Sequence, residues 1–432
     1  MPDRCEVQHA DLPAARAPPR SGARCVSRPA GTPALARNVT VLSLTAAFAS
    51  FWLLAWSPVV PLLLAHAGAS ATAIAATFAA VNLATALPQY AGGRLADRVG
   101  VRRVIGVSGL ALGLTWAGMA LSQGSWLGFA LFYVAGNALF GLQSTAFITI
   151  VSDSVPAGGR ARAFSTYQFW SAASLVAGPL AGGLLLLPHL PPAAYLGATA
   201  AAYFGVGVVR LATLREPRHL TAAPRPPITP ARLAESAAGS PGRRELLLLT
   251  TGVTLAFALT VNGPFLPLAT HHLDRVPTHV VDLLFGIGPL GAMAASALGP
   301  GLRAGRSALV LGLSTLALAT AALALPLGPV GLVAAYLLAF AGYQLATVAF
   351  STRRVALAGD DEVGEVLGAT SAFGGVCAFA ALLLAGLLGS RLPLAAGAMI
   401  AVATALWQAR GRPLVGIRAA LREVAAGRQI TS

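Results

Sequence analysis

Ionisable side chains are scarce inside the apolar runs of this 432-residue sequence. Asp282 is the only acid that lies inside such a run and away from its ends. Membrane interiors tolerate few ionisable groups, and a carboxyl group can take up and release a proton. Asp282 is therefore a candidate proton carrier. Asp97 of the 91–104 loop and the histidines near His271 are the alternatives.

Uncharged polar and aromatic side chains offer hydrogen bonding and stacking. Asn137 and Gly141 share one helix face, as do Tyr167 and Ser171. Such residues could bind a small molecule, or they could only hydrogen-bond between packed helices. The tryptophans Trp52 and Trp56 could stack on a ligand or anchor a helix at the membrane interface.

Composition places most of the chain in lipid. The sequence is 56% hydrophobic and 10% charged, whereas a soluble domain carries about 25% charged residues. The net charge of +15 does not indicate nucleic acid binding, because all 30 basic residues are arginines in short loops and tails between apolar runs. Cys5, Cys25 and Cys377 suggest no disulfide framework, and no metal site or cofactor motif is predicted.

Twelve apolar runs have about the 20 residues that a spanning helix needs. Every arginine except Arg275 and Arg391 falls on the side of the membrane that holds both termini, which predicts a cytoplasmic location for the termini. The predicted runs are 40–65, 71–92, 104–122, 126–149, 164–187, 192–213, 246–269, 279–299, 307–325, 328–350, 366–388 and 392–409. The predicted regions are a disordered tail 1–38, a six-helix half 39–214, a cytoplasmic linker 215–245, a second half 246–410 and a tail 411–432.

The halves resemble each other in sequence. Three short patterns recur in order, at offsets between 201 and 206 residues, which suggests duplication of a six-helix unit. The pairs are Pro58-x-x-Pro61 with Pro264-x-x-Pro267, Arg98-x-Gly100 with Arg303-x-Gly305, and Gly141-x-Gln143 with Gly342-x-Gln344.

The loop from residue 91 to residue 104 packs one acid, four arginines and three glycines between two apolar runs. Its arginines could simply hold the loop in the cytoplasm. Its spacing is more particular, since Gly93, Leu95, Asp97, Arg98 and Gly100 are followed by two arginines. This pattern resembles the signature loop between helices 2 and 3 of the major facilitator superfamily, whose secondary transporters consist of two six-helix halves.

The resemblance implies a gate built on this loop. Asp97 would face the N-terminus of the 366–388 helix, where the helix dipole favours an anion. The family usually has a basic residue at position 101, here Val101, so Arg102 or Arg98 would have to pair with Asp153. The implied gating residues are Gly93, Asp97, Arg98, Gly100, Arg102 and Asp153.

The resemblance also favours helices 1, 4, 7 and 10 as lining a cavity. Together with the polar patterns, it gives the substrate-binding candidates Trp52, Asn137, Tyr167, Asn262, Tyr343 and Gln344. The segment from Gly178 to Gly183 (GPLAGG) resembles an exporter motif of the family. Asn137 stands where proton-coupled exporters often carry an arginine.

The sequence thus predicts an all-α membrane protein with twelve helices that moves a small, neutral or amphiphilic molecule by alternating access. Export is favoured over uptake, which stays open, as do a sensor and a membrane enzyme. No catalytic residues are assigned. The expected partners are the substrate and the lipid bilayer, and the expected state is a monomer in the plasma (inner) membrane.

Overall fold

The computed structural model describes residues 33–155, 160–216, 241–273, 275–298, 306–358, 363–388 and 391–410. Every regular element among these residues is helical. The expected tail 411–432, residues 1–32 of the expected tail 1–38, most of the linker and the second Arg-x-Gly copy at 303–305 lie outside the described residues. The expected disorder was wrong for residues 33–38, because the first helix begins at Pro33. Within the described part of the chain, ten helical stretches are long and apolar enough to cross a membrane, judged by length and composition.

The first half of the chain contains helical segments in each of the first six predicted runs. The first run is broken into three pieces and the fifth into two, because Pro58 and Pro179 cannot donate a backbone hydrogen bond. The elements are α1 (Pro33–Leu54), η1 (Ser57–Val59), α2 (Val60–His66), α3 (Ala71–Val99), α4 (Val101–Leu121), α5 (Trp126–Asp153), α6 (Arg160–Ala181), the π-helical turn η3 (Gly182–Leu186) and α7 (Pro192–Thr213).

The second half repeats this order, with a break in its first run. The α9 helix ends at Leu259 and α10 begins at Phe265, directly after Pro264. The elements are α9 (Pro241–Leu259), α10 (Phe265–Leu273), α11 (Thr278–Leu298), α12 (Arg306–Leu323), α13 (Pro329–Ala358), α14 (Val363–Ala385) and α15 (Arg391–Ala409).

Local sequence sets several helix ends. Ser70 and Ser125 cap α3 and α5, since their hydroxyls accept hydrogen bonds from the backbone N–H groups of Ala73 and Gly128. Gly100 separates α3 from α4 with φ of +95°, a conformation that glycine adopts without the strain other residues incur. The tight turn between these two helices therefore depends on glycine at this position.

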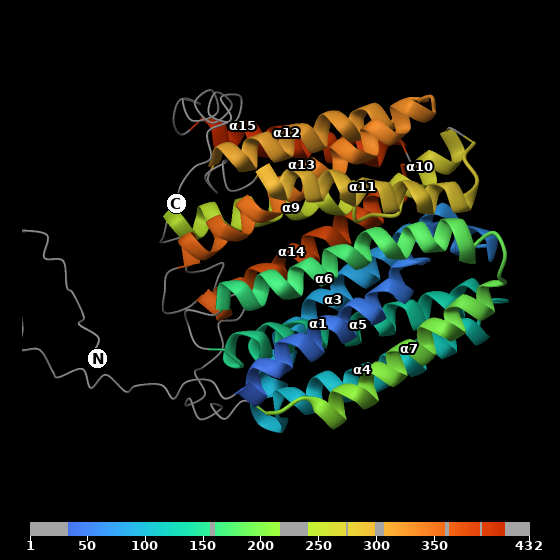
Figure 1. Ribbon diagram of the computed structural model, residues 1–432. Helices are drawn as coiled ribbons and strands as arrows, with labels where there is room; N and C mark the ends of the chain where they lie inside the picture. The colour runs from blue at the N-terminus through green and yellow to red at the C-terminus, as the bar shows by residue number, and fades with distance from the viewer. Residues whose placement is uncertain are drawn as a thin grey trace, which may run out of the picture.

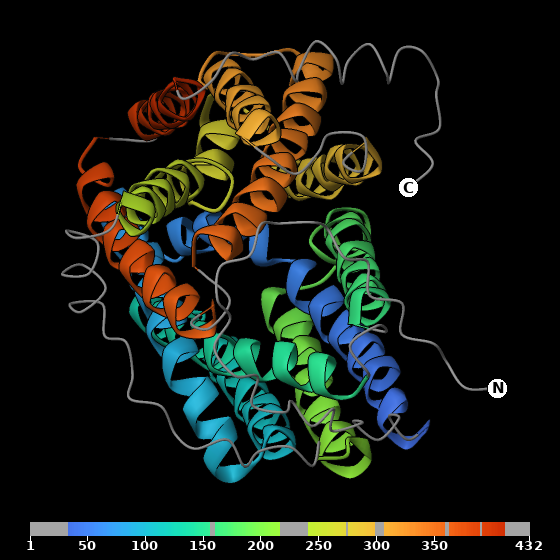
Figure 2. The same cartoon turned by 90° about the vertical axis from the view of Figure 1, so that its left-hand side faces the viewer.

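The helices form two groups with the same internal packing, seen side-on in Figure 1 and end-on in Figure 2. The α1 helix packs on α6 and α7 as α9 packs on α14 and α15, and α4 packs on α7 as α12 packs on α15. The groups meet along two seams, where α3 lies beside α14 and α6 lies beside α11. This arrangement is the two-fold repeat that the sequence predicts.

One of the three repeated patterns does not hold in three dimensions. The backbone of Gly141 lies against Thr85 of α3, whereas that of Gly342 lies against Leu316 of α12. Because α3 and α12 occupy different places in their halves, the two Gly-x-Gln copies are not structurally equivalent. The proline pair is equivalent, since both copies lie at the break in the first run of their half.

The two ends of the bundle differ in how the halves meet. At the end that holds α2 and α10, called here the α2–α10 end, α2 contacts α10, and both η1 and η3 contact α11. The opposite end holds the turn at Gly100 and is called the α3–α4 end. These contacts add to those of the two seams, so the halves meet more closely at the α2–α10 end.

Candidate functional site

The break between α9 and α10 exposes an amide between buried neighbours. Residues 260–264 are not helical, and their backbone is held by bonds from the N–H groups of Thr260 and Asn262 to the carbonyl of Phe257. Val261 and Gly263 are buried, but Asn262 is exposed. Irregular backbone at membrane depth is tolerated where it is buried in protein or lines a cavity, and broken helices commonly form transporter binding sites.

A second helix supplies a partner for this amide. Asn262 Nδ2 donates to the hydroxyl of Tyr343 on α13 at 3.4 Å. The Tyr343 ring lies 4.5 Å from that of Phe257 on α9, with the ring planes tilted by 54°. Tyr343 of α13 thus presents a hydroxyl and an aromatic face beside the exposed amide of Asn262.

Gln344 extends the polar surface towards α11. Its Nε2 donates to the hydroxyl of Ser296 at 3.1 Å, and Ser296 is exposed. The structure therefore joins Asn262 to Tyr343 and places Gln344 next to it in the chain. We call Asn262, Tyr343, Gln344 and Ser296 the C-half polar cluster.

The three candidates from the first half are not joined to that cluster by any hydrogen bond among the described residues. Trp52 is half-buried on α1 and meets Phe51 edge to face at 5.7 Å. Asn137 is half-buried on α5, and its Nδ2 donates to the carbonyl of Tyr133 in its own helix at 2.9 Å. Tyr167 is half-buried on α6 and contacts Phe147. These side chains remain candidates by position only.

Trp56 does not stack on a ligand or anchor a helix at the interface in this structure. It is fully buried, its Nε1 donates to the Thr199 hydroxyl at 2.9 Å, and its ring packs edge to face on Trp116 at 5.7 Å. The break after Leu54 turns Trp56 into the core of the first half. The expectation for this residue was wrong because four-residue spacing does not tell which side of a broken helix faces the core.

Asp282 lies on α11 near the α2–α10 end and is 0% exposed. Neither carboxyl oxygen has a hydrogen-bond partner among the described residues. The side chain lies against the backbone of Gly182 in η3, across the seam between the halves. The sequence identified the acid, but not its position between the halves.

Arg210 is a buried cation in the last turn of α7, where it is only 1% exposed. Its Nε donates to the hydroxyl of Thr45 at 3.0 Å, and its guanidinium lies 4.9 Å from the centre of the Phe147 ring. Packing of α7 against α1 encloses the side chain, so it stabilises the interior of the first half through a cation–π contact.

The α3–α4 turn is held by an acid that sequence reasoning missed. Glu216 follows α7, and its carboxylate accepts hydrogen bonds from the backbone N–H groups of Val101 at 2.6 Å and Arg102 at 3.0 Å. A carboxylate at a helix N-terminus satisfies free N–H groups and the helix dipole. The sequence offers little warning, because a lone acid after an apolar run is ordinary.

The predicted gate is only partly described. Arg98 and Arg102 have exposed side chains. Gly93 and Asp97 lie in α3 and Asp153 ends α5. The contacts of these three residues are outside the part of the chain that the structure describes. The pairings expected for Asp97 and Asp153 therefore stay predictions.

Two polar clusters fix the helix ends at the α3–α4 end. In the first half, Asn38 Nδ2 donates to the Ser154 hydroxyl at 3.0 Å and to the Arg215 carbonyl at 2.9 Å, and its Oδ1 accepts from the Arg215 N–H at 2.9 Å. We call these three residues the Asn38 cluster. They tie the start of α1 to the ends of α5 and α7.

In the second half, an acid takes the corresponding place. Glu245 of α9 accepts from Arg353 Nε at 3.1 Å and from Arg306 Nη2 at 3.4 Å. Burial alone would raise the pKa of Glu245, but the hydrogen bonds and charges of Arg353 and Arg306 outweigh it and hold the pKa below its ordinary value. We call these three residues the Glu245 cluster.

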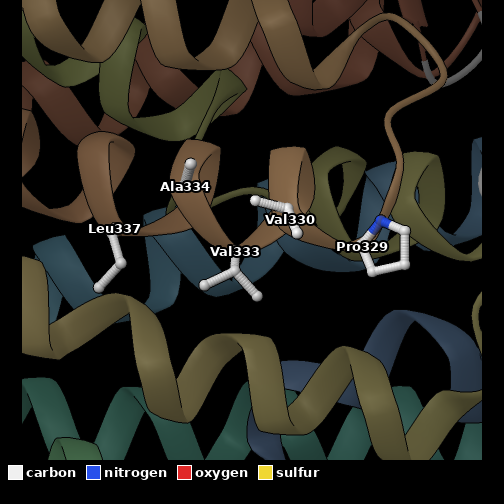
Figure 3. A pocket seen from close by; sticks show the side chains of 5 residues that line it. All are labelled: Pro329, Val330, Val333, Ala334 and Leu337. Carbon is white, nitrogen blue, oxygen red and sulfur yellow. The ribbon is translucent and has the colours of Figure 1, made fainter.

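A hollow of about 390 Å³ lies along the first turns of α13. Its lining side chains are all apolar, as Figure 3 shows: Pro329, Val330, Val333, Ala334 and Leu337. It offers no hydrogen-bonding side chain, so it does not match the chemistry of the C-half polar cluster.

Comparison with known proteins identifies the fold. A sequence model of the Major Facilitator Superfamily matches residues 40–382. Among curated proteins, no sequence matches.

Three solved structures illustrate the likeness. The POT family transporter PepTSo has a TM-score of 0.70 at 14% identity, over 90% of this chain and 99% of its own. A point mutant of the nucleoside transporter NupG has 0.68 at 13%, over 87% and 99%. A bacterial homologue of the iron transporter ferroportin, in an inward-facing state, has 0.62 at 18%, over 89% and 99%. At these identities the likeness establishes the fold alone.

Proposed function

Because this chain belongs to the Major Facilitator Superfamily, whose members carry small molecules across lipid bilayers, we propose that it exports a neutral, weakly polar or amphiphilic compound by alternating access. The family and the similar structures point to a transporter and not to an enzyme. The C-half polar cluster is the proposed centre of substrate recognition.

The exposed amide of Asn262 carries this proposal. It lies at the break between α9 and α10, and its one described side-chain partner is the Tyr343 hydroxyl at a long 3.4 Å. A bound molecule could therefore replace or share this bond at little cost. The nearby Phe257 and Tyr343 rings offer an apolar surface, which suits a ligand that is partly hydrophobic.

The charged side chains that the described helices enclose support a neutral substrate. Asp282 and Arg210 are both enclosed by protein, at 0% and 1% exposure. A multiply charged cation or a phosphorylated anion would need an accessible opposite charge, because an unpaired buried charge costs several kcal/mol. The described side chains that surround Asn262 provide amides, hydroxyls and rings instead.

The direction of transport rests on the GPLAGG segment. Its Gly178 lies against the backbone of α1, and its Gly183 lies against α11. Close approach of three helices at one point is what glycines permit, and it lets the two halves rock about a tight contact. Together with the resemblance to the exporter motif, this packing supports export.

The test is flux into proteoliposomes with a compound panel. The panel starts from nucleosides and peptides, the substrates named for similar structures, and adds amphiphilic drugs and sugars. For a transported compound, Asn262→Leu should raise KM by about tenfold, the equivalent of one lost hydrogen bond to a substrate. The matched control is Gln123→Leu, since Gln123 is a half-buried amide in the turn after α4 whose Nε2 donates to the nearby carbonyl of Ala120.

Transport of the compound with unchanged KM in Asn262→Leu would place recognition elsewhere. High-affinity transport of a dication or a sugar phosphate would contradict the proposed substrate class.

A further inference from the structure

Three elements from both halves meet at Asp282, at the α2–α10 end. Asp282 is on α11 of the second half, while Gly182 begins η3 and Ala55 follows α1, both in the first half. A Cβ added to Gly182 would overlap the carbonyl oxygen of Ala55 and Oδ2 of Asp282 at once. These two oxygens therefore converge on one point. We call Ala55, Gly182 and Asp282 the Asp282 junction.

Ala55 contributes a carbonyl that the helix break leaves unused. In a continuous helix this carbonyl would accept from the N–H of Val59. Here Val59 N–H donates to the carbonyl of Trp56 instead, at 3.1 Å, as the chain passes into η1. No described group donates to the Ala55 carbonyl, and Ala55 is fully buried.

Among the described residues, neither of these two acceptors has a donor. Two buried acceptors close to each other are unfavourable, and an ionised carboxylate in an apolar site costs far more than a neutral carboxyl group. A single proton removes both penalties, because a neutral carboxyl group has an O–H that can donate to a carbonyl. The geometry therefore favours a proton on Asp282 while the two halves are closed at this end.

Other titratable groups near the junction are few. On α11 itself His279 lies one turn earlier, and the described residues of η1 and η3 carry none. The remaining described groups around this end are Tyr195 of α7, Tyr336 of α13, His271 and His272 of α10, Arg275 between α10 and α11, His66 of α2 and His189 between η3 and α7.

We propose that the Asp282 junction is a proton site shared by the two halves: Asp282 is protonated while the α2–α10 end is closed and loses its proton when that end opens. This inference rests on the proposed transport function and adds to it a gate that responds to the pH on the side that opens. Opening moves Asp282 away from Ala55 and Gly182 and exposes the carboxyl group to water. Each opening then releases the proton to that side, and each closing takes one up from the same side.

A simple pH dependence follows. The closed state binds one proton more than the open state, so raising the pH shifts the population towards the open state. The ratio of closed to open molecules should fall by up to about tenfold per unit of pH. The direction is the same whether or not a substrate is bound.

The populations can be measured without knowing the substrate. Spin labels at His66→Cys and His272→Cys report the distance between α2 and α10, whose side chains at these positions are exposed. The background is Cys5→Ser, Cys25→Ser and Cys377→Ala in the full chain, reconstituted in liposomes. Double electron–electron resonance between pH 5 and pH 9 should show a short-distance population that declines as the pH rises.

Two variants should act in opposite directions. Asp282→Asn keeps a neutral side chain that can donate, so the short distance should persist at every pH. Gly182→Ala places a methyl group on both oxygens, so the long distance should dominate at every pH. The matched control is Gly197→Ala, since nothing lies within 4 Å of a Cβ at Gly197. His279→Gln should leave the pH dependence unchanged.

The proposal is overturned if the wild-type distances do not change with pH, if Asp282→Asn keeps the wild-type pH dependence, or if sodium at constant pH produces the shift instead. Flux separates this from the proposed function. With Asp282→Asn, exchange of a transported compound should continue but should no longer change with the pH on the side that opens. Absence of any flux in the wild type would contradict the transport function and leave the pH-dependent distances as a separate result.

Discussion

The two halves differ in what occupies the break in their first helix. Each begins with a helix that breaks before a Pro-x-x-Pro pattern, and the residue two positions before the first proline is Trp56 in one half and Asn262 in the other. Trp56 is buried and bonded to Thr199, so the first break is filled by the protein's own side chain. Asn262 is exposed, so the second break is left available to a ligand.

This difference indicates a division of labour after duplication. Both halves keep the broken helix, because the prolines and their packing require it. The first half fills its break with an aromatic cluster, in which Trp116 contacts Trp56, Tyr133 and Tyr203. The second half surrounds its break with hydrogen-bonding groups. Substrate recognition is therefore expected to be more sensitive to changes in the second half.

The largest expected effect on stability comes from removing the side chain of Trp56, which fills the break in the first half. Trp56→Ala removes a fully buried ring and leaves the Thr199 hydroxyl without its donor, and should lower the free energy of unfolding by about 3–5 kcal/mol. Thermal unfolding in detergent, followed by tryptophan fluorescence, measures the loss. Trp52→Ala should cost much less, since Trp52 is half-buried. Equal losses in the two variants would remove the contrast between filled and open breaks.

A smaller effect is expected at the Asn38 cluster. Asn38→Ala leaves the backbone N–H of Arg215 and the Ser154 hydroxyl without their partner, and should cost about 1–3 kcal/mol. Because this cluster is held by an uncharged amide, the loss should be the same at low and high salt. A strong salt dependence in a denaturation series would show that charges hold this end.

The smallest effect is expected at the Glu245 cluster, which is partly open to solvent. Glu245→Gln should cost about 1 kcal/mol, because solvent weakens exposed ion pairs, and the cost should shrink as salt is added. The native pKa of Glu245 lies below its unfolded value, so the stabilisation is present above about pH 4.3 and is lost as the pH falls through the native pKa. Unfolding of wild type and variant between pH 3 and pH 7 measures this, and parallel curves would contradict it.

Much of the fold could be predicted because it depends on local signals. The apolar runs, the prolines at the breaks and the loop around Gly100 each fix a helix or a turn from neighbouring residues alone. The sites depended more on distant partners. Asn262 and Tyr343 were chosen separately and proved to be bonded, whereas Trp56 was misplaced because its contact with Thr199 comes from a distant helix.

The other features that the sequence did not indicate also depend on partners that are distant in the sequence. Glu216 caps α4 from a position more than a hundred residues later, and nothing in its neighbours indicates that role. Arg210 is near the end of its run, yet residues of α1 and α5 enclose it, and no neighbour in the sequence indicates this. The Gly-x-Gln pair looked like a repeat because the offset was similar, but its glycines face different helices. Sequence spacing locates a residue on a helix and says little about the neighbour it meets.

The Asn38 cluster also bears on how the protein is made. Asn38 precedes nearly all of the first half, and its partner Arg215 follows the last helix of that half. These bonds cannot form until the ribosome has delivered residue 215 to the membrane, and by then every helix of the first half has been synthesised. Since domains generally fold as units in the order of synthesis, the first half can complete itself while the second is still being translated. A chain cut after Glu216 would keep all of these bonds, so the two halves are natural pieces to express separately and reassemble.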